Sequence, residues 1–136
     1  MIEFKRKYAI SLLIVFWCAL FAATHIPGEA FIDLPFTVSD LLAHGVAYFI
    51  LSVLFLMAIR RPDVSMTTDA RRLFVVLGLY AACDELLQIP IPGRYGSWKD
   101  WGADILGMVT ALIIVFLFYR WQRRRSQSGE KVSESV

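Results

Sequence analysis

The sequence predicts an all-α integral membrane protein, a four-transmembrane-helix bundle with both termini cytoplasmic. Composition is the first reason, because 57% of the 136 residues are hydrophobic and 19% are charged, against about 45–50% and about 25% in soluble domains. A chain this short cannot bury so much apolar surface in a soluble core. The apolar residues also gather in long runs with basic residues between them. This pattern excludes a secreted disulfide-bonded domain, a cytosolic enzyme and a disordered chain.

Four apolar runs predict the membrane spans, each of which needs about 20 mostly apolar residues. The first run has 17 uncharged residues, more than the about 7–15 of a signal-peptide core, so we expect a retained helix. The second carries no charge beyond that of His44, the third ends in the polar residues Asp84 and Glu85, and the fourth has Asp104 near its start. The predicted spans are residues 8–24, 41–59, 73–89 and 101–119.

Basic residues set the predicted orientation. Twelve of the 14 lysines and arginines lie before the first run, between the second and third, or after the fourth. Arg94 and Lys99 are the two on the other side. The positive-inside rule therefore places both termini in the cytoplasm. The chain divides into a cytoplasmic N-terminus, a membrane domain and a basic tail whose polar composition predicts disorder; these are residues 1–7, 8–119 and 120–136.

Small residues in the runs predict how the helices pack. Ala103, Gly107 and Ala111 recur at four-residue spacing in the last run, and such stripes allow close helix approach in lipid. Cys18 and Cys83 each stand alone in an apolar run, without the paired spacing of a zinc or redox site. We expect both cysteines to be small packing residues.

Polar residues of three predicted spans gather near the outer membrane face. Asp40, His44 and Tyr48 are four residues apart and therefore share one face of the second helix. Asp84 and Glu85 lie within membrane depth, where a charge needs a partner, water or a proton. Together these residues predict an outward-facing ligand pocket with nine members: Asp40, His44, Tyr48, Asp84, Glu85, Gln88, Arg94, Asp100 and Asp104.

Structural roles stay open for three of these side chains. Asp40 and Asp100 each follow a hydroxyl residue, Thr37 and Ser97, at the spacing of a helix-capping box. His44 has an alternative role as a packing histidine bonded to Asp40. The pattern alone does not decide between capping, packing and ligand binding.

The chemistry of the pocket leaves enzyme status open. The catalytic candidates are His44 and Glu85 as general bases and Arg94, whose guanidinium would stabilise negative charge. The sequence requires no cofactor. A divalent cation is the one group that its carboxylates suit, and the candidate ligands are Asp84, Glu85, Asp100 and Asp104.

These motifs, in this order, resemble the VanZ-like membrane family. The family pattern has an Asp, a His and a Tyr on the second span, Asp-Glu-x-x-Gln and Pro-Gly-Arg after the third, and Asp-x-x-x-Asn-x-x-Gly on the fourth. The matching positions are Asp40, His44, Tyr48, Asp84, Glu85, Gln88, Pro92, Gly93, Arg94, Asp100, Asp104 and Gly107, with Thr24 and Pro27 as a looser match. The chain departs from the pattern at Leu41, where the family often has Lys, and at Asp104, where it usually has Asn. Both departures make the pocket more acidic.

The resemblance implies a multi-pass protein of the bacterial cytoplasmic (inner) membrane that acts at the cell envelope. The family's namesake is associated with teicoplanin resistance. The expected function is to bind an envelope or lipid-linked ligand, or a glycopeptide, through the polar pocket. The alternatives are an intramembrane enzyme acting on a lipid-linked substrate and a small ion-coupled carrier working as a homo-oligomer. The expected partner is the lipid bilayer, and no nucleic acid is expected.

Overall fold

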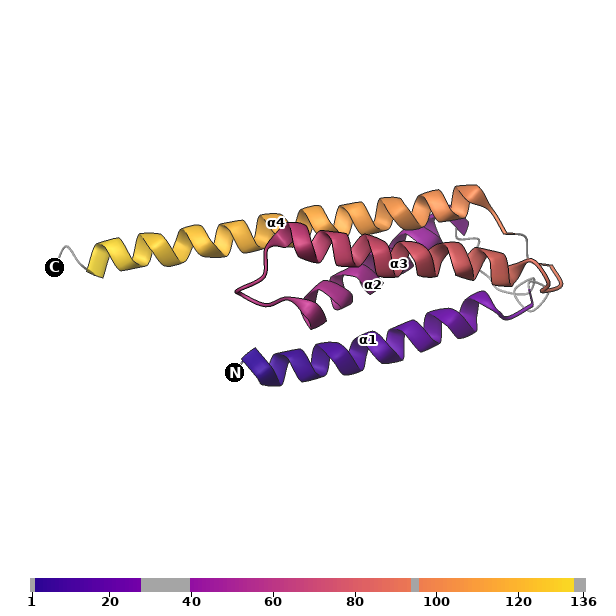
Figure 1. Ribbon diagram of the computed structural model, residues 1–136, viewed down its shortest axis with the longest axis horizontal. Coiled ribbons are helices and arrows are strands. Elements are labelled where there is room, and N and C mark those ends of the chain that lie inside the picture. Colours follow the sequence, from indigo (N-terminus) through magenta and orange to yellow (C-terminus); the bar gives the residue numbers. More distant parts are fainter. Residues whose placement is uncertain (1, 28–39, 94–95, 134–136) are drawn as a thin grey trace.

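The computed structural model describes four α-helices, and it has no strand within the described residues, which are 2–27, 40–93 and 96–133. The all-α prediction is confirmed. The helices run alternately up and down, so α1 begins and α4 ends at the same end of the bundle (Figure 1). Their bounds are α1 Ile2–Thr24, α2 Asp40–Ile59, α3 Met66–Gln88 and α4 Trp98–Ser133.

Helix α2 is the centre of the bundle. It packs against α1, α3 and α4, and its most extensive interface is with α4. The shared core is apolar and comes from α2, α3 and α4; its fully buried members include Leu51, Leu56, Leu73, Leu77 and Met108. The outer faces of the helices carry large exposed apolar side chains, such as Leu12, Leu79, Leu106 and Leu117. Exposed apolar surface on this scale is typical of a protein that a bilayer covers.

Two glycines bring α2 and α4 together. A Cβ atom added at Gly107 would overlap the Gly45 carbonyl oxygen and lie 2.9 Å from the Phe49 amide nitrogen. The backbones therefore touch at this point, as expected for a small residue at a membrane-helix interface. Because His44 precedes Gly45 and Asp104 lies one turn before Gly107, this contact also brings the ends of the two helices close.

Three of the helices are long and apolar enough to cross a membrane: Arg6–Thr24, Asp40–Ile59 and Trp98–Gln122. Helix α3 is not among them by composition. Asp69, Arg71 and Arg72 near its start and Asp84 and Glu85 near its end leave a short uncharged stretch between them.

Helices α3 and α4 extend beyond the predicted spans. Helix α3 begins at Met66 because Ser65 caps it, accepting a hydrogen bond from the Thr68 amide at 3.2 Å. Helix α4 continues to Ser133, through most of the tail that composition predicts to be disordered. Side-chain contacts join neighbouring turns there. The Trp121 ring stacks on Phe118, and the guanidinium carbon of Arg125 lies 4.1 Å from the centroid of the Trp121 ring.

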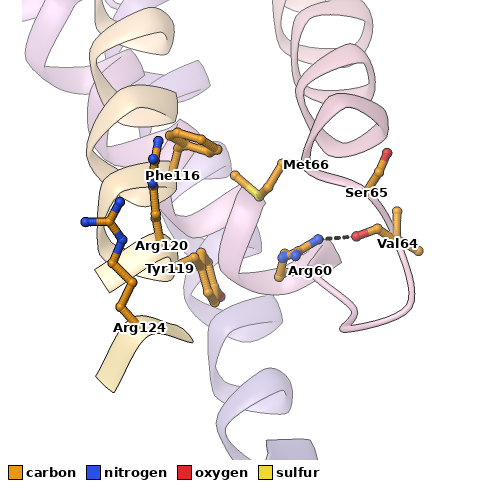
Figure 2. A pocket seen from close by; sticks show the side chains of 8 residues that line it. All are labelled: Arg60, Val64, Ser65, Met66, Phe116, Tyr119, Arg120 and Arg124. Atoms are coloured by element: carbon orange, nitrogen blue, oxygen red, sulfur yellow. Dashed lines mark hydrogen bonds between the residues drawn. The ribbon is translucent and has the colours of Figure 1, made fainter. Parts of the chain in front are cut away.

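A buried ion pair closes the end of the bundle opposite the α3–α4 loop. Asp69 is fully buried and accepts a hydrogen bond from Arg60 Nη1 at 2.8 Å. The same Nη1 donates to the Val64 carbonyl (Figure 2), and Arg72 Nη1 lies 3.7 Å from the carboxylate of Asp69. On α1, Arg6 Nε donates to the Ala58 carbonyl at 3.0 Å. These contacts tie the α2–α3 loop and α1 to the end of α2.

Candidate functional site

All four helices place buried polar side chains at the end of the bundle where α1 and α3 end and α2 and α4 begin (Figure 1). Each of these residues is at most 9% exposed. Desolvating polar groups costs free energy unless they find partners, so their contacts define the site. We call this set the polar cluster; its members are Thr24, His44, Asp84, Glu85, Gln88 and Asp104.

His44 is the hub of the polar cluster. Its Nδ1 lies 3.0 Å from Asp104 Oδ1 and 3.9 Å from Glu85 Oε1. When Asp104 is ionised, its carboxylate only accepts hydrogen bonds, so His44 Nδ1 is then the donor and Nε2 remains for another contact. One imidazole thus joins carboxylates from α3 and α4 to α2.

Asp84 has its hydrogen bonds supplied within the cluster. Thr24 Oγ1 donates to Oδ1 at 3.1 Å, and Gln88 Nε2 donates to Oδ2 at 3.0 Å. His25 Nδ1 lies 3.8 Å from Oδ1. Asp84 therefore fixes the end of α1 to α3, and its role is to position these helices.

Only one of the two carboxylate oxygens of Glu85 has a hydrogen-bond partner among the described residues. Its Oε2 accepts a hydrogen bond from the Ser97 amide at 2.7 Å. Gly96 permits this approach, because a Cβ atom there would lie 2.6 Å from the Glu85 carbonyl oxygen. Among the described residues, Glu85 Oε1 is buried without a hydrogen-bond partner. A buried acceptor left unpaired costs about 1–3 kcal/mol, so this oxygen needs an explanation.

A second unpaired group lies one turn below His44. Tyr48 is 1% exposed, and its hydroxyl has no hydrogen-bond partner within the described part of the chain. The acidic groups that act on it electrostatically are Asp104, Asp84 and Glu85. Two unpaired polar atoms therefore lie at the site within the described residues: the Glu85 carboxylate oxygen in the polar cluster and the Tyr48 hydroxyl beside it.

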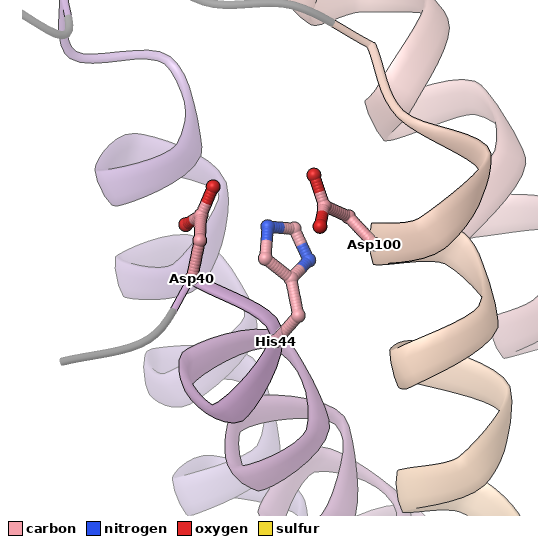
Figure 3. Close-up of side chains that lie close together, drawn as sticks. All are labelled: Asp40, His44 and Asp100. Atoms are coloured by element: carbon pink, nitrogen blue, oxygen red, sulfur yellow. The ribbon is translucent and has the colours of Figure 1, made fainter.

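Asp40 and Asp100 form the rim of the site. Figure 3 shows the His44 ring between their carboxylates, and one ligand atom of each residue lies within 4.8 Å of the others. Asp40 is exposed and Asp100 is half-buried. His44 therefore lies between a buried pair of carboxylates and a pair at the surface.

Two groups of side chains have the spacing to hold a cation, and they share His44. The outer group is Asp40, His44 and Asp100, and the buried group is His44, Glu85 and Asp104. One imidazole with two carboxylates suits zinc or manganese. Of the predicted cation ligands, Glu85, Asp100 and Asp104 belong to these groups, whereas the oxygens of Asp84 already accept hydrogen bonds from Thr24 and Gln88.

The structure brings most of the predicted pocket together. Five of its nine members are in the polar cluster, two form the rim, and Tyr48 lies below His44. Arg94, a predicted pocket residue and catalytic candidate, lies outside the described residues. His44 bonds to Asp104 rather than to Asp40 as the packing alternative supposes.

The capping alternatives have separate outcomes. Ser97 caps α4 by accepting a hydrogen bond from the Lys99 amide at 3.2 Å. Asp100 lies in the same first turn of α4 and also within reach of His44. The Thr37 half of the other predicted capping box lies outside the described residues.

Sequence reasoning missed His25 at the site. The residue follows Thr24 directly in the sequence, but nothing in its spacing links it to Asp84.

Comparisons of the chain with protein families, with curated proteins and with solved structures found no match.

Proposed function

We propose that the chain spans the bacterial cytoplasmic membrane four times, with α3 as the remaining span and both termini in the cytoplasm. Basic residues at the start of α1, around the α2–α3 loop and in the last part of α4 lie at one end of the bundle, which supports this orientation. The charges of α3 have partners that make a membrane location tolerable. Asp69 pairs with Arg60 near the start of α3, and Asp84 accepts hydrogen bonds from Thr24 and Gln88 near its end. The polar cluster then faces the outer side.

We propose that the polar cluster binds an envelope or lipid-linked ligand, and that the protein contributes to resistance to teicoplanin-type glycopeptides as a VanZ-like protein. One observation carries the proposal: within the described residues, Glu85 Oε1 in the polar cluster and the Tyr48 hydroxyl beside it are buried without hydrogen-bond partners. All four helices contribute to the cluster. Unpaired polar atoms of this kind are rare in proteins unless something binds them. A ligand is the natural partner for both atoms.

The negative charge of the site restricts which chemical groups of a ligand can bind there. Three carboxylates, those of Asp84, Glu85 and Asp104, are buried there, and among the described residues only His25 and His44 form ion pairs with them. Asp40 and Asp100 add two carboxylates at the rim. A bare phosphate would be repelled. The ligand therefore presents hydrogen-bond donors, such as hydroxyl or ammonium groups, or reaches the site through a cation held by His44, Glu85 and Asp104.

We prefer a binding protein to an enzyme or a carrier, because a bound ligand alone would supply partners for the unpaired atoms. An intramembrane enzyme would use Arg94, outside the described residues, to stabilise negative charge. An ion-coupled carrier would use the same carboxylates in an oligomer, and it predicts substrate flux in proteoliposomes. A binding protein requires neither.

Glu85→Gln is expected to abolish the protection that the wild-type protein gives against teicoplanin. The amide keeps the size of the side chain but replaces the acceptor charge, and losing one charge-assisted hydrogen bond weakens ligand binding about tenfold or more. The measurement is the inhibitory concentration for a deletion strain that re-expresses each variant at equal membrane level. A wider panel of envelope-active compounds on the deletion strain identifies the relevant phenotype.

Asp63→Asn is the matched control, because Asp63 is an exposed acid in the α2–α3 loop, remote from the cluster. It should protect as well as the wild type. Full protection by the Glu85→Gln variant would contradict the proposal that this cluster is the functional site.

A further inference from the structure

A pocket of about 380 Å³ lies at the opposite end of the bundle from the polar cluster. It is formed by α4 on one side and by the end of α2 and the start of α3 on the other (Figure 2). Its lining includes three arginines, two aromatic residues and a methionine: Arg60, Arg120, Arg124, Phe116, Tyr119 and Met66.

The pocket is strongly basic. Three arginines line it, and none of its lining residues is acidic within the described part of the chain. Arg60 is held in place by the buried Asp69 at 2.8 Å and by the Tyr119 ring, whose centroid lies 5.3 Å from its guanidinium carbon. Arg120 and Arg124 are exposed and lie one turn apart on α4, so their side chains share one face of the helix.

The rest of the lining is apolar and aromatic. Met66, Phe116 and Tyr119 face the pocket beside the arginines (Figure 2). Phe116 and Tyr119 lie in the last turns of the apolar stretch Trp98–Gln122, where aromatic side chains mark the membrane–water boundary. A pocket with a cationic half and an apolar half at this depth matches a molecule that is itself divided into an anionic head and an apolar tail.

We propose that this pocket binds the phosphate of an anionic phospholipid from the cytoplasmic leaflet. Arg120 and Arg124 contact the phosphate oxygens, for which the planar guanidinium is suited, while Met66 and Phe116 contact the upper acyl chain. Basic pockets between membrane helices on the cytoplasmic side have this ligand preference. The inference uses the proposed membrane orientation but is independent of any ligand at the polar cluster.

The test uses the purified full chain in a neutral detergent and measures its unfolding temperature. Dioctanoyl phosphatidylglycerol should raise the temperature saturably, whereas dioctanoyl phosphatidylcholine and inorganic phosphate should not. For the same rise in unfolding temperature, the double variant Arg120→Gln/Arg124→Gln should need a phosphatidylglycerol concentration at least about tenfold higher. This is the effect expected from losing charge-assisted hydrogen bonds. Both side chains are exposed, so the variant keeps the packing of the bundle, and Arg120→Gln alone provides a second, milder variant.

Arg125→Gln is the control, because Arg125 stacks on Trp121 and is not among the residues that line the pocket. It should respond to the lipid as the wild type does. Three results would overturn the proposal: an unchanged response in both Arg120 variants, an equal rise with phosphatidylcholine, or a rise with inorganic phosphate alone, which would assign the pocket to a free anion. None of these results bears on Glu85, so failure here is distinct from failure of the proposed function.

Discussion

Asp69→Leu is expected to lower the free energy of unfolding by about 3–5 kcal/mol, the usual effect of removing one partner from a buried ion pair. Asp69 is fully buried and Arg60 is 10% exposed, so leucine would leave the Arg60 guanidinium without its counter-ion in a desolvated place. The neighbouring Arg72, 3.7 Å from the same carboxylate, would add repulsion. The measurement is reversible unfolding of the purified protein in mixed micelles.

Two companion variants show whether the ion pair is the cause. Asp63→Leu removes an exposed acid from the α2–α3 loop and should change stability by about 0.5 kcal/mol or less. Arg60→Met/Asp69→Leu removes both charges and should recover much of the loss, because burying no charge costs less than burying one. Equal stabilities of the Asp69→Leu and Asp63→Leu variants would contradict the stabilising role of the Arg60–Asp69 ion pair.

Gly107→Ala is expected to cost about 1–3 kcal/mol, the range for inserting an extra carbon into a packed interface. The added methyl group would overlap the Gly45 carbonyl oxygen and crowd the Phe49 amide, and backbone atoms cannot rotate away as a side chain can. The two helices must separate, which moves Asp104 away from His44. Loss of stability and loss of the proposed teicoplanin protection should therefore occur together in this variant.

Gly102→Ala is the matched control on the same helix. A Cβ atom at Gly102 would meet nothing within 4 Å, so alanine should stabilise α4 by up to about 1 kcal/mol through its higher helix propensity. If the Gly107→Ala protein proved as stable as the Gly102→Ala protein, this result would contradict the close approach of the α2 and α4 backbones at Gly107.

Much of the polar cluster can be predicted from the sequence, but its hydrogen-bond partners cannot. Spacing of four residues predicts that Asp40, His44 and Tyr48 share a face, and helix direction predicts that Asp84, Glu85 and Asp104 meet them at one end. These inferences need only helix geometry and alternating spans. Partner choice within the cluster needs the distance between helices, which depends on which residues touch. Gly107 against Gly45 selects Asp104 as the hydrogen-bond partner of His44, and no pattern along the chain specifies that pair.

The opposite end of the bundle was not predictable in the same way. Asp69 stands among basic residues in a polar segment, where an exposed carboxylate is the usual outcome. Its burial follows from the way the α2–α3 loop returns Arg60 onto α3. The length of α4 is a similar case, because polar composition predicts disorder while contacts between successive turns, such as Arg125 on Trp121, favour a continued helix.

The Tyr48→Phe variant tests whether the unpaired hydroxyl beside the polar cluster contacts a ligand, as proposed. Phenylalanine removes the buried, unpartnered hydroxyl and keeps the ring. Removing a buried polar group that lacks a partner should leave stability unchanged or raise it by about 1–3 kcal/mol. The measurement is teicoplanin protection at equal membrane level, with stability recorded on the same variant. We predict that the Tyr48→Phe protein is at least as stable as the wild type and protects less, whereas full protection would contradict the proposal.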